Sequence, residues 1–184
     1  MEKSINKIPI GISSCLLGNN VRYDGGHKYD RLIVDTLNKE FELIGFCPEV
    51  EIGLGVPRPK IQLVNFNQET RCLDELTNQI DYTDQLAQCY DQNQSWLTSI
   101  SGYIFKTKSP SCGLSKVTTK YLHKETENHI LKSDGRGIFA RTLVERIPGL
   151  PVIEEDEFEQ AERRQQFLLD VVKYFQSSNT SLNR

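Results

Sequence analysis

The residues best suited to chemistry lie in segment 106–113, which combines two lysines, two serines, a proline, a glycine and Cys112. This segment follows the apolar run 102–105, which is typical of a buried strand. Cys15 and Cys47 also follow apolar runs that predict strands. Ligands of open α/β sheets bind outside the carboxyl ends of the strands, which meet at one edge when the strands are parallel. We therefore expect the three thiols to converge.

Three converging thiolates would form a soft ligand set, which selects zinc, copper(I) or an iron–sulfur cluster. A [4Fe-4S] cluster on three thiolates leaves one iron without a protein ligand, and that iron could act as a Lewis acid. A zinc ion on the same thiolates, with water or Glu49 as fourth ligand, is the alternative. The residue pattern does not separate the two.

The other two cysteines are expected outside this site. Cys89 lies on the apolar face of the helix predicted at 83–100, where a free cysteine packs as a small hydrophobic residue. Cys72 lies in a polar segment without an evident partner. Five widely spaced cysteines without a CxxC pair do not resemble a secreted disulfide framework.

Polar side chains beside the three cysteines are candidates for acid–base work and substrate binding. Glu49 follows Cys47 by two residues and could act as general acid or base next to a metal centre. Ser109 could donate a hydrogen bond to a substrate, although a serine beside a proline also forms turns. Further candidate substrate contacts, each with an ordinary alternative as a loop residue, are Ser14, Arg22, Asp24, Lys108 and Ser111.

A phosphate-binding loop of the cysteine phosphatase type is a rival interpretation of the first cysteine. Such loops have the pattern C-x5-R followed by serine or threonine, and their geometry depends on that spacing. From Cys15 to Arg22 the spacing is one residue too long, and Tyr23 replaces the hydroxyl residue. The pattern therefore argues against phosphate chemistry.

Composition narrows the class of protein. The 184 residues carry a net charge of -3, whereas nucleic-acid binders usually show a basic excess. No run approaches the ~20 apolar residues that span a bilayer, and the first residues lack the apolar core of a signal peptide. We expect a cytoplasmic protein that acts on a small molecule, not on a membrane or nucleic acid, as a monomer or a dimer.

The remaining pattern predicts an α/β fold. Strands are expected at 9–13, 41–46, 102–105 and 150–153, and helices between and after them include 30–39, 138–146 and 83–100, the last broken at Asn93. A strand at 60–66 leads into a protruding hairpin that ends near Tyr82, and a short extended segment at 117–123 is followed by a polar turn to Ser133. We expect a single three-layer Rossmann-like domain over 1–184, with a mainly parallel sheet, a small hairpin insertion and a polar tail from about residue 177.

Several separate motifs, in order, resemble the DUF523 family. They are Gly-Ile-Ser-Ser-Cys15-Leu-Leu-Gly with Val-Arg-Tyr-Asp-Gly25, Phe-Cys47-Pro-Glu-Val with Gly-Leu-Gly-Val-Pro-Arg58, Lys-Ser-Pro-Ser-Cys112-Gly, Gly-Ile-Phe-Ala-Arg141 and Leu-Pro-Val-Ile-Glu-Glu155. The family includes thiouracil desulfidases, whose [4Fe-4S] cluster is held by three cysteines and has an open iron that takes the sulfur from a thiolated base.

The resemblance implies roles for individual residues. Cys15, Cys47 and Cys112 would be the cluster ligands, Glu49 would shuttle protons, and Ser109 would orient the substrate. The implied reaction replaces the sulfur of a base such as 2-thiouracil with oxygen, without net redox change. The alternatives are a structural or sensory zinc or cluster site, and a sulfur-transfer enzyme for another small molecule.

Overall fold

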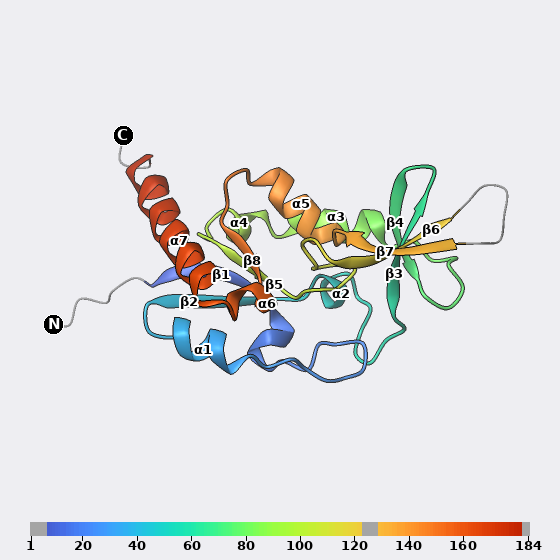
Figure 1. The fold of residues 1–184 in the computed structure, drawn as a ribbon, viewed down its shortest axis with the longest axis horizontal. Coiled ribbons are helices and arrows are strands. Elements are labelled where there is room, and N and C mark those ends of the chain that lie inside the picture. Colours follow the sequence, from blue (N-terminus) through green and yellow to red (C-terminus); the bar gives the residue numbers. More distant parts are fainter. Residues whose placement is uncertain (1–6, 123–128, 182–184) are drawn as a thin grey trace.

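The computed structural model describes residues 7–122 and 129–181. Its centre is sheet A, whose strands stand in the order β2-β1-β5-β8 with every neighbouring pair parallel (Figure 1). The four strands are β1 (Ile8–Ser13), β2 (Phe41–Phe46), β5 (Tyr103–Phe105) and β8 (Val152–Glu154). Each is a short apolar run, and the parallel order brings all four carboxyl ends to the same edge.

Helices cover both faces of sheet A, which gives the expected three layers (Figure 1). Alternate side chains of a strand point to opposite faces. Ile10 and Ile12 therefore pack on α1 (Arg31–Leu37), α6 (Glu155–Phe158) and α7 (Ala161–Ser181). On the other face, Tyr103 and Phe105 pack on α3 (Thr83–Gln92), α4 (Gln94–Leu97) and α5 (Ile138–Arg146). The mainly parallel, Rossmann-like α/β class is confirmed.

Local signals explain several helix ends. The side chain of Asp30 caps α1 by accepting from the backbone N–H of Ile33 at 3.0 Å. The predicted break at Asn93 is confirmed, because this residue separates α3 from α4. Thr83 is the first residue of α3, and its hydroxyl accepts from the backbone N–H of Cys72, so this side chain links the helix to β4 and does not cap the helix.

The predicted hairpin is present, but it belongs to a second sheet. Sheet B has the order β4-β3-β6-β7, formed by β3 (Ile61–Phe66), β4 (Glu69–Asp74), β6 (Val117–Leu122) and β7 (His129–Gly135). The central pair β3–β6 is parallel and the outer pairs are antiparallel. One face of sheet B packs on α3 and on Ile138 at the start of α5.

Two expectations for the polar segments change. The polar turn predicted up to Ser133 is wrong from His129 on, because residues 129–135 form β7 along β6; residues 123–128 of that prediction lie outside the described residues. Near the end of the chain, α7 continues to Ser181, past residue 177 where a polar tail was expected. Within the described ranges, none of the helices has the length and apolar character needed to cross a bilayer.

Candidate active site

The three cysteines that follow strands line one cavity at the carboxyl edge of sheet A. Cys15 lies in a 3-10 turn, η1 (Ser14–Leu17), directly after β1. Cys47 lies between β2 and the short helix α2 (Pro48–Glu51), and Cys112 lies in the loop after β5. The cavity has a volume of about 390 Å³ and all three cysteines are among its lining residues. The expected convergence of the three strand ends is therefore present in the structure.

Nearly all candidate site residues share this cavity. Besides the three cysteines, the lining includes Ser14, Arg22, Glu49, Lys108, Ser109 and Ser111. Asp24 is the exception: it is not a lining residue, and its exposed carboxylate accepts hydrogen bonds from Arg22 and from the backbone of Gly26. The expected substrate contact at Asp24 has no support in this geometry, because that carboxylate serves to hold Arg22.

Burial sets the protonation of the three thiols. It raises the pKa of Cys15 to about 11, and the neighbouring thiol of Cys47 adds to the shift, while Lys106 and Arg22 oppose it. Burial also raises the pKa of Cys47 and Cys112 above the ordinary value. A raised pKa favours the protonated thiol, so a metal centre that binds these three thiols would displace their protons.

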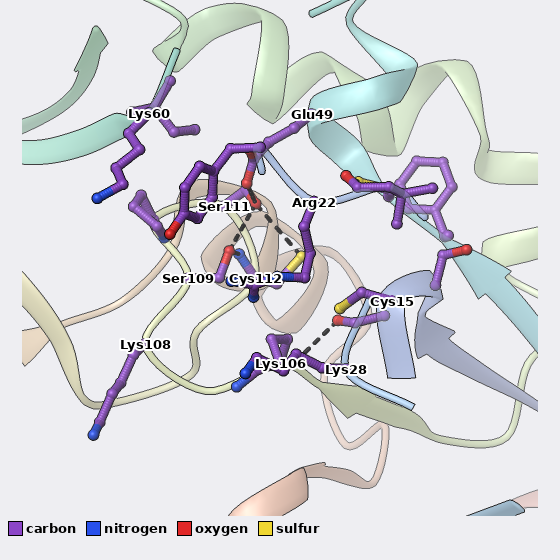
Figure 2. Close-up of a pocket in the computed structure, with 18 of the residues that line it drawn as sticks. Cys15, Arg22, Lys28, Glu49, Lys60, Lys106, Lys108, Ser109, Ser111 and Cys112 are labelled. Atoms are coloured by element: carbon purple, nitrogen blue, oxygen red, sulfur yellow. Dashed lines mark hydrogen bonds between the residues drawn. The ribbon is translucent and has the colours of Figure 1, made fainter. Parts of the chain in front are cut away.

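Glu49 lies at the middle of a hydrogen-bonded chain (Figure 2). Its Oε1 accepts from the hydroxyl of Ser111 at 2.7 Å, and that hydroxyl lies 3.0 Å from Oγ of Ser109. Its Oε2 accepts from Nε of Arg58 at 2.9 Å and forms an ion pair with Nη2, also at 2.9 Å. The Ser109 hydroxyl also accepts from the backbone N–H of Cys112 at 3.2 Å. The carboxylate is thus linked to the segment that carries the third cysteine.

The other candidate residues lie around these hydrogen bonds, and their side chains differ in solvent exposure. Ser14 is buried and its hydroxyl accepts from Asn19 at 2.8 Å. Ser111 is 1% exposed, so its hydroxyl faces Glu49 and not open solvent. Lys108 is exposed and extends away from the labelled thiols (Figure 2). The lysine takes positive φ, at 61°, in the sharp turn after β5.

Two buried carboxylates at the end of β8 anchor the Cys112 loop (residues 106–115). Glu155 accepts from the backbone N–H of Thr107 at 2.6 Å and pairs with the Lys106 ammonium group. Glu154, 0% exposed, accepts from the backbone of Leu114 at 2.8 Å and from Ser115 at 3.2 Å. Sequence reasoning assigned no role to either glutamate, although both follow a predicted strand as the three cysteines do.

The first turn of α5 holds the middle of the same loop. The backbone N–H of Ile138 donates to the carbonyl of Pro110 at 3.1 Å, and that of Ala140 to the carbonyl of Ser111 at 3.2 Å. A Cβ at Gly137 would lie 2.5 Å from the carbonyl carbon of Ser111, so this close approach requires glycine. The two glutamates therefore hold the two ends of the loop, and α5 holds its middle.

The donor set suits a thiophilic metal centre. Three thiols from three separate loops face one cavity, and sulfur ligands favour iron–sulfur clusters or zinc. In the part of the chain described here, no three His, Cys, Asp or Glu side chains are grouped closely enough to hold a single metal ion. Cysteine thiolates are the usual protein ligands of iron–sulfur clusters. The residues present fit a cluster on Cys15, Cys47 and Cys112.

Known protein families and solved structures include relatives of this chain. The model of the 2-thiouracil desulfurase family matches residues 10–156. A solved structure of the "[4Fe-4S]-dependent thiouracil desulfidase TudS (DUF523Vcz)" is similar, with a TM-score of 0.64 and 27% sequence identity over 87% of this chain and 99% of that chain. Comparison with curated proteins finds no match. The resemblance to the DUF523 family is confirmed, and the chain belongs to the 2-thiouracil desulfurase family of sulfur-removing enzymes.

Proposed function

We propose that this enzyme is a [4Fe-4S]-dependent desulfidase for a thiolated nucleobase such as 2-thiouracil. The observation that carries the proposal is that thiols from three strand ends line the same cavity as Glu49 and Ser109. The likeness to a thiouracil desulfidase that depends on such a cluster supports it. In the overall reaction one water replaces the sulfur, which leaves as hydrogen sulfide, and no electrons are transferred.

The chain's own residues divide the work around the cofactor. Cys15, Cys47 and Cys112 would hold the cluster. When bound, the cluster supplies an iron without a protein ligand, which can polarise the thiocarbonyl bond. The lining contains six cationic side chains and one carboxylate. Three of the cations are already paired, Arg22 with Asp24, Arg58 with Glu49 and Lys106 with Glu155, so the other three lysines would offset the negative charge that thiolate ligation brings into the site. The cations are Arg22, Lys28, Arg58, Lys60, Lys106 and Lys108.

Glu49 is the acid–base group in this proposal. Its Oε1 contacts only the Ser111 hydroxyl among the hydrogen bonds of the site, and this oxygen can take the proton of the attacking water and return it to the leaving sulfur. Ser109 would orient the base, because its hydroxyl belongs to a residue that lines the cavity and lies 3.0 Å from the Ser111 hydroxyl that donates to Glu49. Burial of the site keeps bulk water from competing for these hydrogen bonds.

Anaerobic reconstitution tests the cofactor. We expect the wild-type protein to bind iron and sulfide, and Cys15→Ala, Cys47→Ala and Cys112→Ala each to lose the intact cluster. Cys89→Ala is the matched control, because Cys89 is also a buried free cysteine but does not line the cavity. Wild-type protein that takes up zinc and no iron, or a cluster retained in all three cavity variants, would contradict the assignment.

Turnover in isotopically labelled water tests the reaction. We expect reconstituted enzyme to release uracil and sulfide from 2-thiouracil, with the label in the new carbonyl group. Sulfide release that requires an added thiol acceptor would instead favour sulfur transfer, and an iron-loaded protein without turnover would favour a structural or sensory site.

A further inference from the structure

The side chain of Arg58 contacts three different groups at the cavity. The arginine lies in the loop between α2 and β3, and its side chain is only 3% exposed. Nε and Nη2 each lie 2.9 Å from Oε2 of Glu49, and Nη1 donates to the carbonyl of Gly55 at 2.9 Å. Nη2 also lies 4.0 Å from Sγ of Cys47. One guanidinium thus joins the acid–base candidate to a cluster-ligand candidate.

These contacts give the two oxygens of Glu49 different tasks. Oε2 is held by the guanidinium, whereas Oε1 faces Ser111 and, through it, Ser109. Glu49 sits on α2, a helix of four residues that is too short to fix a side chain by packing alone. The arginine therefore fixes the orientation of the carboxylate, so that one oxygen stays on the guanidinium and the other faces the Cys112 loop.

Only a guanidinium can make this set of contacts. Its planar fork holds three donors in fixed directions, which meet a carboxylate, a carbonyl and a sulfur atom together. A lysine at this position could keep the positive charge, but its single ammonium group could not reproduce the geometry. Charge and geometry can therefore be separated by substitution.

We propose that Arg58 is a positioning residue that directs Oε1 of Glu49 towards Ser111 and Ser109 and places positive charge beside the Cys47 thiolate. The acid–base part of this inference rests on the proposed function. The charge part concerns the metal centre alone and does not require turnover.

The experiment compares Arg58→Gln and Arg58→Lys with wild-type enzyme after anaerobic reconstitution. Arg71→Gln is the matched control, because Arg71 also pairs with carboxylates but lies on sheet B, outside the cavity lining. The readouts are iron and sulfide content, kcat and KM for 2-thiouracil, and the midpoint potential of the cluster from a redox titration followed by electron paramagnetic resonance.

We expect both Arg58 variants to lose about 10- to 100-fold in kcat, the effect of a misplaced catalytic group, with KM changed much less. The midpoint potential should fall in Arg58→Gln, because a nearby positive charge favours the reduced cluster, and stay near the wild-type value in Arg58→Lys. Arg71→Gln should match the wild type in every readout. If a variant takes up too little iron for these measurements, a rescue experiment takes its place. Free guanidinium is added to Arg58→Ala and should restore both the cluster content and kcat.

The outcomes separate this inference from the proposed function. An iron-loaded wild type that leaves 2-thiouracil unchanged ends the proposed function, and the midpoint potential of Arg58→Gln then decides the charge part by itself. Wild-type kcat and potential in loaded Arg58→Gln would overturn the inference. A raised KM with unchanged kcat would overturn it too, because that result means substrate binding and not positioning of Glu49.

Discussion

The two sheets carry the same kind of ion pair in opposite settings. At the edge of sheet A, the side chains of Arg58 and Glu49 are 3% and 13% exposed. On sheet B, Arg71 is 39% exposed and pairs with Asp81 and Glu69, which are 33% and 67% exposed. Water screens the second group of charges, whereas loss of one partner in the first leaves a buried charge unpaired. We therefore expect loss of one ion-pair partner to have a large effect on the protein at the cavity and a small effect on sheet B.

The largest effect is expected from Glu49→Gln. This change keeps the shape of the side chain and removes its proton-transfer capacity, so kcat for thiouracil should fall by about 10²- to 10⁴-fold. Glu69→Gln, the corresponding change on sheet B, should leave kcat unaltered. Steady-state kinetics on protein with matched iron content measures both, and equal activity of the two variants would remove Glu49 from the mechanism.

A smaller effect is expected from Glu155→Gln, at the first residue of α6 directly after β8. This change removes the ion pair with Lys106 and weakens the hydrogen bond from the Thr107 backbone, both partly buried. We expect a loss of about 1–3 kcal/mol in the free energy of unfolding, together with reduced iron loading because the Cys112 loop loses an anchor. Urea unfolding and iron analysis measure the two effects. Unchanged loading would show that Glu155 does not position the third cysteine.

The hairpin of sheet B should carry a pH dependence of its own. Hydrogen bonds from the backbone N–H groups of Ile80 and Thr77 lower the pKa of Asp74 from 3.8 to about 2. Because the folded-state pKa lies below the unfolded one, Asp74 stabilises the fold fully above about pH 4 and loses this contribution as the pH falls towards 2. In Asp74→Asn, acid unfolding should be flatter in that window; an identical pH profile would contradict the prediction.

The smallest effect is expected from Arg71→Gln. Exposed ion pairs contribute about 0.2–1 kcal/mol, and the contribution of Arg71 should shrink further in salt. A double-mutant cycle with Asp81→Asn, measured at low and high ionic strength, gives the coupling. A coupling as large as that between Arg58 and Glu49 would remove the contrast between the two sheets.

Residues near in sequence determined much of the fold. The apolar runs that became β1, β2 and β5, the cap at Asp30 and the break at Asn93 were all predictable from local pattern. The rule that parallel strands end at one edge then placed Cys15, Cys47 and Cys112 together. Sheet B was only half predictable, because β3 pairs with β6 across a long intervening segment and β7 has an exposed, polar pattern.

The sequence by itself determined the strand ends that carry the three thiols, because strand and turn propensities act over a few residues. Only the tertiary structure decided which groups surround those thiols. Arg58 pairs with Glu49, Ser111 donates a hydrogen bond to Glu49, and Lys106 pairs with Glu155. Each charged or hydroxyl group could equally have faced solvent, and the sequence does not state which partner it meets. Burial at the carboxyl edge of sheet A removes the water that would compete for these hydrogen bonds, and each pairing is specific for that reason.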